Sequence, residues 1–262
     1  MAADEKFTKE RILEIETWVP GKLFSIKTTR PSNLRFIAGQ FARLGVMRST
    51  PNGDAITWRA YSIVSSPHEE HLEFFSIVVP DGEFTSELHR LAPNDTLYLE
   101  KTNYGFLTTD RFENGRDLWL LSSGTGLAPF ISILNDLETW ETYERIILVH
   151  SVREPEELAY RKAIEGMKDH EYFGEFAASR LFYVPVVTRS EMPGMLSARI
   201  TNLLDTGELE RFTGIPLDFE RSRIMICGNP DMVEDIRKLL GERGFSVSKR
   251  GAPGHMAVEN YW

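Results

Sequence analysis

The chain has 262 residues, of which 42% are hydrophobic and 26% are charged, a composition typical of globular proteins that bury a core. The formal net charge of −9 argues against general nucleic-acid binding, and the single cysteine, Cys227, excludes an internal disulfide and a cysteine-ligated metal or iron–sulfur cluster. The charged N-terminus lacks the apolar run of a signal peptide, and no stretch approaches the ~18 apolar residues of a membrane span, so we expect a cytoplasmic protein.

The first part of the chain predicts short strands. Segments rich in β-branched and aromatic residues occur at 22–29, 40–46, 60–65, 72–79 and 96–101, and turn-forming stretches separate them. One helix is expected at 85–91, where Thr and Ser precede apolar residues at helical spacing. Several strands at this spacing indicate an antiparallel barrel or sandwich.

The character of the chain changes at 110–116, DRFENGR, which has the composition of a linker. Apolar runs then alternate with helical patterns: strands are predicted at 117–123, 145–152, 181–188 and 222–228, and helices at 127–138, 154–168 and 230–244. This alternation predicts an α/β fold with a doubly wound parallel sheet. We therefore predict two domains, residues 1–110 and residues 111–262.

Two glycine-containing turns each follow an apolar strand and precede a helix. In SSGTGLAPF, residues 122–130, Gly124 and Gly126 allow a tight turn that a pyrophosphate could approach, although Pro129 replaces the third glycine of the dinucleotide fingerprint. The second turn, CGNPDM, spans 227–232. Because ligands of open α/β sheets bind at the carboxyl ends of strands, the two turns predict one site. An ordinary strand-to-helix turn is the alternative at each position.

Three shorter patterns leave more than one interpretation open. RAYS, residues 59–62, places Arg59 and Tyr61 on one strand face, suited to phosphate binding and ring stacking, but it also suits an ordinary strand. HEEH, residues 68–71, has i, i+3 spacing in a turn, which favours a solvated loop over zinc. The terminal Tyr261 and Trp262 require a partner, which could be a core pocket, another subunit or a flat ligand.

Charge is unevenly distributed along the chain. From Thr17 to Gly53 there is no acidic residue, and this stretch holds six basic ones: Lys22, Lys27, Arg30, Arg35, Arg43 and Arg48. A solvated strand face is one interpretation, and a docking patch for an acidic partner is the other.

The motifs RAYS, VPDGEFTSEL, SSGTGLAPF, CGNPDM and VENYW, taken in this order, resemble the bacterial ferredoxin–NADP reductase family over nearly the whole chain. The resemblance implies an N-terminal antiparallel barrel that binds FAD and a C-terminal α/β domain that binds NADP. It implies that Arg59 holds the FAD pyrophosphate, Tyr61 stacks on the isoalloxazine and Ser62 lies near flavin N5. The remaining implied FAD residues are Ala60, Phe75, Ser76, Ile77, Val78, Glu83, Phe84, Thr85 and Thr125, with Tyr261 on the opposite flavin face and Trp262 on the adenine.

For NADP, the resemblance implies arginines at the 2′-phosphate, a group that each can bind through paired hydrogen bonds. The implied NADP residues are Gly124, Gly126, Arg153, Thr188, Arg189, Arg199, Cys227, Gly228, Asn229 and Met232. The implied reaction passes a hydride from nicotinamide C4 to flavin N5, and the reduced flavin then releases single electrons to ferredoxin or flavodoxin. Ser62, Cys227 and Glu259 would shape the hydride site, and Glu259 would either relay a proton or serve a structural role.

The expected partners are therefore NADPH and an acidic carrier protein bound transiently, with NADPH oxidation as the working direction and with no metal, nucleic acid or membrane. We expect a monomer. Two other functions stay open: an NAD(P)H:flavin reductase that uses flavin as a passing substrate, and a flavin-binding sensor without turnover.

Overall fold

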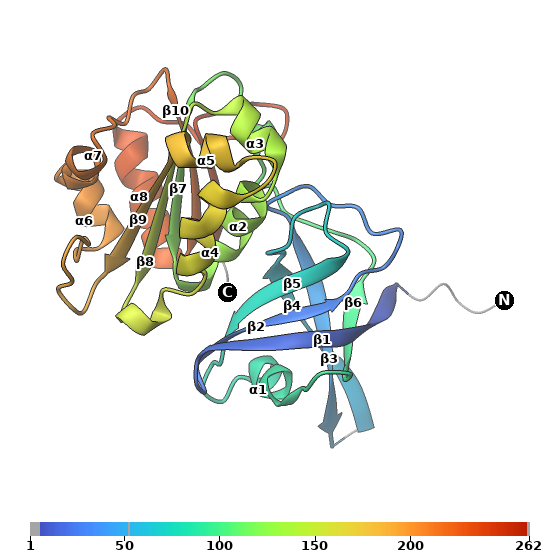
Figure 1. The fold of residues 1–262 in the computed structure, drawn as a ribbon. Coiled ribbons are helices and arrows are strands. Elements are labelled where there is room, and N and C mark those ends of the chain that lie inside the picture. The colour runs from blue at the N-terminus through green and yellow to red at the C-terminus, as the bar shows by residue number, and fades with distance from the viewer. Residues whose placement is uncertain (1–5, 52, 261–262) are drawn as a thin grey trace.

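The computed structural model describes residues 6–51 and 53–260, which form two sheets that lie side by side (Figure 1). The first sheet is antiparallel and has the strand order β4-β3-β6-β1-β2-β5. Its strands are β1 (Phe7–Val19), β2 (Leu23–Thr29), β3 (Phe41–Thr50), β4 (Gly53–Ser62), β5 (His71–Ile77) and β6 (Thr96–Glu100). The edge strands β4 and β5 meet through a bridge between Ile63 and Phe74, so the sheet curls into the predicted barrel.

The barrel core is apolar, and one helix packs against its outside. Phe24, Ile26, Leu44 and Phe74 are among the core residues that the curled sheet encloses. The helix α1 (Glu83–Arg90) contacts β3 and β4, and it buries Phe84 and Leu88 in the same core. The loop that leads into α1 is therefore held close to the ends of β4 and β5.

The second sheet is parallel and has the order β11-β10-β7-β8-β9. Its strands are β7 (Asp117–Ser123), β8 (Arg145–Val152), β9 (Leu181–Val187), β10 (Ser222–Gly228) and β11 (Met256–Asn260). The chain winds outward from β7 in both directions, so the point between β7 and β10 is the switch point where ligands of such sheets bind. The doubly wound fold predicted from the sequence is confirmed.

Helices cover both faces of this sheet (Figure 1). One face carries α2 (Ala128–Leu134), α3 (Leu137–Thr142), α4 (Arg161–Glu165) and α5 (Gly174–Arg180), and the other carries α6 (Ile200–Asp205), α7 (Glu208–Thr213) and α8 (Pro230–Glu242). Short 3₁₀ helices are η1 (Thr109–Arg111), η2 (Gly124–Leu127), η3 (Pro155–Glu157) and η4 (Gly166–Asp169). We propose a domain boundary between residues 110 and 111, inside η1. None of the helices in the described part of the chain has the length and apolar character needed to cross a bilayer.

Several elements differ from the sequence-based expectation. The strand β1 was not predicted, because most of its residues remain solvent-accessible and its charged side chains obscure the alternation. The predicted helix 127–138 is divided near Asp136, whose side chain caps α3. The predicted helix 154–168 is interrupted at Tyr160, which adopts a left-handed backbone conformation with φ of 59°. Helices α5, α6 and α7 and strand β11 were also missed.

Candidate functional site

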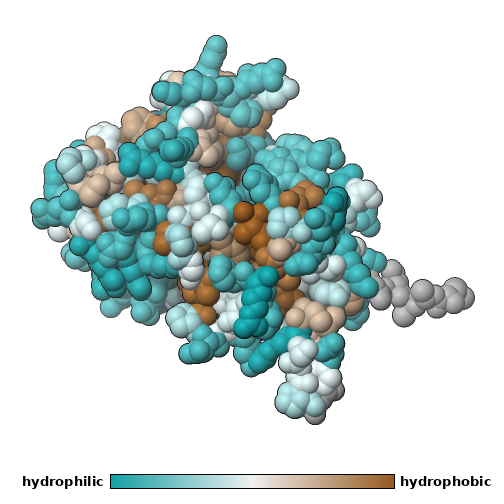
Figure 2. Space-filling model, turned by 60° about the horizontal axis from the view of Figure 1, so that its bottom comes forward, coloured by the Kyte–Doolittle hydropathy of each residue, from teal (hydrophilic) through white to brown (hydrophobic). Residues whose placement is uncertain are grey.

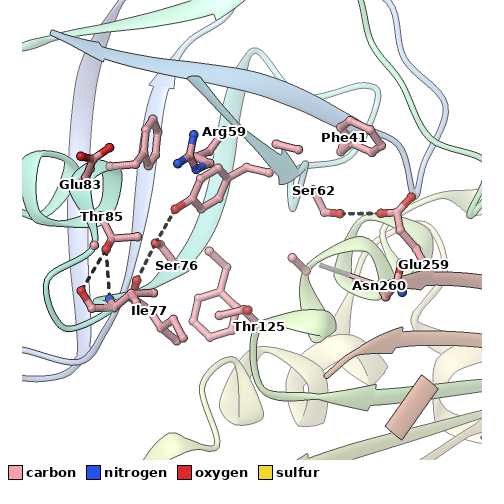
Figure 3. A pocket seen from close by; sticks show the side chains of 17 residues that line it. Phe41, Arg59, Ser62, Ser76, Ile77, Glu83, Thr85, Thr125, Glu259 and Asn260 are labelled. Atoms are coloured by element: carbon pink, nitrogen blue, oxygen red, sulfur yellow. Dashed lines mark hydrogen bonds between the residues drawn. The ribbon is translucent and has the colours of Figure 1, made fainter. Parts of the chain in front are cut away.

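A cavity of about 610 Å³ lies where the two halves of the molecule meet (Figure 3). On the face shown in Figure 2, hydrophobic surface is concentrated near the centre and is bordered by hydrophilic side chains. The described residues that line the cavity are Phe41, Arg59, Ala60, Tyr61, Ser62, Phe75, Ser76, Ile77, Val79, Gly82, Glu83, Phe84, Thr85, Thr125, Ala128, Glu259 and Asn260. The fold thus gathers most of the predicted FAD residues around one space.

The end of β4 supplies a cation, a ring and a hydroxyl. The exposed Arg59 donates to the backbone carbonyl of Trp58, and the ring of Tyr61 packs against Phe84 with centroids 5.6 Å apart. Burial raises the pKa of Tyr61, whose hydroxyl lies 3.1 Å from Ser76 Oγ. All four residues of RAYS line the cavity, so the last residue of β4 departs from simple face alternation.

The loop before α1 is tightly packed and leads to a helix N-terminus. Thr85 Oγ1 accepts a hydrogen bond from the backbone N–H of Val79 at 3.1 Å, and a Cβ at Gly82 would lie 2.7 Å from that oxygen. No side chain caps the start of α1. Backbone N–H groups at a helix N-terminus attract anions, and Arg59 lines the same cavity, so this end suits a phosphate group. The carboxylate of Glu83, the first residue of α1, forms an ion pair with Arg48 at 2.8 Å.

The α/β half closes the other end of the cavity with Thr125, Ala128, Glu259 and Asn260. Glu259 lies on β11, and one of its carboxylate oxygens accepts a 3.4 Å hydrogen bond from Ser62 (Figure 3). Phosphate-binding groups at one end, aromatic and aliphatic walls in the middle and polar groups at the other end fit a flavin dinucleotide.

The two predicted glycine turns meet at the switch point between β7 and β10. Ser123 Oγ accepts a hydrogen bond from the backbone N–H of Asn229 at 3.0 Å. A Cβ at Gly126 would lie 2.3 Å from the Cys227 carbonyl oxygen, and a Cβ at Gly228 would lie 2.3 Å from Ser123 Oγ. These two glycines therefore allow the turns to pack against each other, whereas nothing lies within 4 Å of the Cβ position of Gly124, which is exposed.

The remaining residues of these turns have structural contacts as well. The Asn229 side chain caps α8 by accepting from the backbone N–H groups of Asp231 and Met232. The side chain of Cys227 is fully buried in the core beneath the sheet and is not among the residues lining the cavity. A contribution of Cys227 to the hydride site stays a prediction.

The predicted phosphate-binding arginines gather at the carboxyl ends of β8 and β9. The backbone N–H of Arg189 donates to the carbonyl of Arg153 at 3.1 Å, which places these exposed residues side by side. The hydroxyl of Thr188 donates a hydrogen bond to the backbone carbonyl of Val152. Arg199 is exposed at the start of α6, in the segment that follows the bridge between Val186 and Leu196.

Among the described residues, five that line the cavity were not predicted from the sequence: Phe41, Val79, Gly82, Ala128 and Asn260. Phe41 stands opposite Ser62 in the β3–β4 register, a pairing that the sequence motifs do not reveal. Val78, expected at the flavin edge, packs against the barrel core and is not among the described residues that line the cavity, so its contact with the flavin stays a prediction. The predictions for Tyr261 and Trp262 lie outside the described residues.

Two other sequence features resolve into ordinary contacts. In HEEH, His71 Nε2 lies 3.0 Å from a Glu69 carboxylate oxygen, and the described residues contain no His, Cys, Asp and Glu group that could hold a metal. The basic stretch is largely paired by the fold: Lys22 with Glu157, Lys27 with Glu14, Arg43 with Glu100 and Arg48 with Glu83. Arg30 and Arg35 donate to backbone carbonyls.

Comparison with known proteins agrees with this geometry. Residues 20–105 match the family model of the oxidoreductase FAD-binding domain, and residues 120–238 match that of the oxidoreductase NAD-binding domain. Ferredoxin–NADP reductase of Pseudomonas aeruginosa is 44% identical over 95% of this chain and 95% of its own length. Flavodoxin/ferredoxin–NADP reductase of Escherichia coli is 35% identical over 96% of this chain and 97% of its own length.

A solved structure extends the likeness to three dimensions. The crystal structure of a ferredoxin NADP⁺ reductase from Neisseria gonorrhoeae with bound FAD and NADP shares 36% identity, covers 99% of this chain and all of its own, and has a TM-score of 0.89. A curled antiparallel sheet with a flavin-sized cavity, joined to a dinucleotide-binding sheet, defines an FAD-dependent pyridine-nucleotide oxidoreductase. This chain belongs to the ferredoxin–NADP reductase family, with FAD and NADP(H) as its cofactors.

Proposed function

We propose that the protein passes electrons from NADPH through FAD to ferredoxin or flavodoxin. The main support is the cavity between the two sheets. Along its length lie, one after another, an end suited to phosphate, the ring of Tyr61 and the Ser62–Glu259 pair. The relatives from Pseudomonas aeruginosa and Escherichia coli are reductases of ferredoxin and of flavodoxin or ferredoxin, and these are the two carrier proteins that we assign. When bound, the cofactors supply a two-electron hydride exchange and the release of single electrons.

The side chains then have separate tasks toward FAD. Arg59 and the N-terminal N–H groups of α1 bind the pyrophosphate, and Tyr61, held by Ser76, presents its ring to the isoalloxazine. Phe75 and Ile77 form an apolar wall that excludes water. Ser62 and Glu259 place a hydroxyl and a carboxylate at the end of the cavity nearest the α/β sheet.

The NADP side is assigned to the carboxyl edge of the parallel sheet. Arg153 and Arg189 are adjacent there, and Arg199 begins α6 at the same edge. Three guanidinium groups suit a doubly charged phosphate, since each can donate a bidentate pair. We therefore assign them to the 2′-phosphate, which distinguishes NADP from NAD.

The carrier protein is assigned to the surface beside Phe41. Tyr104 stacks on Phe41 with ring centroids 5.7 Å apart, and the neighbouring Asn103 donates to the carbonyl of Arg35. Ile37 and Phe106 are 50% and 61% exposed, large values for apolar residues. An apolar surface with an exposed arginine at its margin suits an acidic protein that binds transiently. We further propose that the protein is cytoplasmic, because NADPH is an intracellular reductant, and that it acts as a monomer.

An anaerobic titration of the purified protein tests this function. Addition of NADPH should bleach a yellow, FAD-containing protein, NADH in parallel should act far more weakly, and oxidised ferredoxin or flavodoxin should then restore the colour. A colourless protein that turns over added flavin would instead be a flavin reductase. A yellow protein that NADPH does not bleach would be a flavin-binding sensor.

A further inference from the structure

Tyr160 of the α/β half is inserted into the antiparallel half. It ends the loop that follows β8, and the residue is only 6% exposed. Its ring lies between Trp18 of β1, with centroids 4.7 Å apart, and Phe75 of β5, at 5.1 Å and nearly perpendicular. Its backbone has φ of 59°, an unfavourable conformation for a bulky residue that persists only where surrounding contacts enforce it.

The hydroxyl of Tyr160 forms a buried polar contact across the same boundary. It donates to a carboxylate oxygen of Glu73 on β5 at 2.5 Å, and the Glu73 side chain is itself buried. Burial, together with the adjacent carboxylate, raises the pKa of Tyr160 well above its usual value, so the phenol keeps its proton. A buried hydrogen bond to a carboxylate is directional and stronger than one between neutral groups. This contact therefore fixes both the orientation of the Tyr160 ring and how far it inserts into the antiparallel half.

The same loop has a second attachment to the flavin-lining strands. Glu157 accepts the backbone N–H of Arg153 at 2.9 Å through one carboxylate oxygen and pairs with the Lys22 ammonium through the other. The carbonyl of Lys22 accepts the backbone N–H of Val78, just beyond β5, at 2.8 Å. Arg153, assigned above to the NADP phosphate, is thus connected by consecutive contacts to the end of β5.

Apolar side chains enclose the loop 153–160 only in part, so its polar contacts contribute more to holding it in place. A cavity of about 710 Å³ adjoins the loop and is lined by Trp18, Glu73 and Tyr160 among others. Apolar packing alone therefore does not surround the loop on this side. Phe75, which contacts the Tyr160 ring, also lines the flavin cavity.

We propose that Tyr160 is a positioning residue: through Glu73 and Phe75 it sets the placement of the phosphate-binding loop, residues 153–160, relative to the flavin-lining strand β5. The proposal rests on the proposed function, in which a nicotinamide held from this loop must meet a flavin held by β5. Reacting groups misplaced by about 1 Å can lose two orders of magnitude in rate. Tyr160 therefore acts on the reduction of the flavin by NADPH without touching either cofactor.

The test uses Tyr160→Phe, which removes the hydroxyl and keeps the ring, in the FAD-loaded protein. Tyr183→Phe is the matched control, because the Tyr183 hydroxyl lies 3.4 Å from His150 Nδ1 inside the α/β half. We expect the rate of flavin reduction by NADPH in Tyr160→Phe to fall about tenfold or more. FAD dissociation should stay near the wild-type value, and Tyr183→Phe should behave as the wild type in both assays. Glu73→Gln, which keeps a hydrogen-bond acceptor for the Tyr160 hydroxyl, should retain most of the wild-type rate.

Amide hydrogen exchange gives a readout that does not depend on turnover. In Tyr160→Phe, exchange across 153–160 should accelerate, while exchange in β7 and β8 should match that of the wild type. A wild-type reduction rate in Tyr160→Phe, even with a lowered melting temperature, would overturn the proposal, and so would slow reduction with unchanged exchange across 153–160. Failure of NADPH to reduce the unmodified protein would instead refute the proposed function, and the exchange comparison would still test the attachment of the loop.

Discussion

The hydroxyl of Ser62, at the end of β4, donates a hydrogen bond of 3.4 Å to a carboxylate oxygen of Glu259 on β11. This bond joins the last described strand of the chain to the antiparallel sheet, inside the flavin cavity. Its length is near the limit for a hydrogen bond. Hydrogen bonds of this kind in ligand-free active sites often shorten when the substrate binds.

We expect Ser62→Ala to slow the reduction of bound flavin by NADPH about tenfold, the effect of losing one well-placed hydrogen bond in the transition state. NADPH affinity should change little, since the hydroxyl lies away from the arginines at the carboxyl ends of β8 and β9. Stopped-flow absorbance at saturating NADPH measures the effect. Ser132→Ala is the control, because it removes a buried hydroxyl that donates to the carbonyl of Ser65 and is not among the described residues lining the flavin cavity. Equal losses in the two variants would argue against a specific role for the Ser62–Glu259 pair.

A second prediction concerns the choice between NADP and NAD. Arg189→Ala and Arg199→Ala should each raise the KM for NADPH about tenfold, because each removes a charge-assisted hydrogen bond to the 2′-phosphate. The KM for NADH, which lacks that phosphate, should hardly change. Steady-state kinetics with both nucleotides decide the matter. Arg237→Ala, which removes an exposed arginine paired with Glu234 on α8, should leave both values unchanged. Equal use of NADPH and NADH by the unmodified protein would refute the assignment.

The third prediction compares two cations of the acid-free stretch. Arg35 is exposed and its guanidinium donates to backbone carbonyls, whereas Lys27 is paired with Glu14 at 3.2 Å. Neutralisation by Arg35→Gln should therefore lower the rate of carrier reduction and weaken its dependence on salt, since charges at the rim of an interface act mainly on association. Lys27→Gln should have a smaller effect.

Ferricyanide reduction provides the control for this comparison. A small dye needs no docking surface, so its rate should be nearly the same in Arg35→Gln and in the wild type. A parallel loss with dye and carrier would indicate damage at the flavin site instead of a docking defect.

The fourth prediction concerns stability and pH. His150 is fully buried, and desolvation lowers its pKa from 6.5 to about 3. The unfolded chain therefore binds more protons than the folded chain between these values. The free energy of unfolding is consequently highest above pH 6.5 with respect to this group, and it decreases as the pH falls toward 3. The contribution to the slope of the unfolding free energy is at most about 1.4 kcal/mol per pH unit.

Urea unfolding of His150→Gln at several pH values between 6.5 and 4.5 tests this expectation. The variant should show a flatter pH dependence than the wild type. His255 is a useful comparison, because burial also lowers its pKa but the residue is only partly enclosed. His255→Gln should change the slope less. An unchanged slope in His150→Gln would show that other groups dominate acid unfolding.

Local patterns predicted those parts of the molecule in which sequence neighbours act together. Arg59, Tyr61 and Ser62 are consecutive or nearly so, and they line one cavity as the motif suggested. Phe41 and Ala128 could not be found this way, because they reach the cavity through strand pairing and through the contact between the two halves. The interruption at Tyr160 was hidden for the same reason: a residue in a strong helical pattern leaves the helix to meet Trp18 and Glu73, which lie far away in sequence.

The pairing of charged side chains also could not be predicted from local sequence. The stretch from Thr17 to Gly53 is acid-free in sequence, yet the fold supplies Glu14, Glu83, Glu100 and Glu157 to four of its cations. Sequence reasoning treats charge as a property of a segment, whereas pairing across a sheet depends on the register. These four cations are paired with carboxylates of the same chain, so Arg35 is the better candidate for a docking role, and the docking role of the stretch stays a prediction.

The last prediction concerns Tyr261 and Trp262, which lie outside the described residues. The residue before them, Asn260, lines the flavin cavity and pairs with Gly228 at the switch point. We expect Trp262→Ala to weaken FAD binding while leaving the rate of flavin reduction by NADPH largely intact, because stacking of an aromatic ring adds about 0.5–1.5 kcal/mol beyond the burial of its area. Tyr261→Ser should tighten NADP binding and produce a long-wavelength charge-transfer band, because it frees the flavin face for the nicotinamide. FAD dissociation rates and visible spectra of the two variants test both expectations. Lower thermal stability or dissociation of a dimer, with unchanged FAD affinity, would mean that these two rings pack against protein instead of the cofactor.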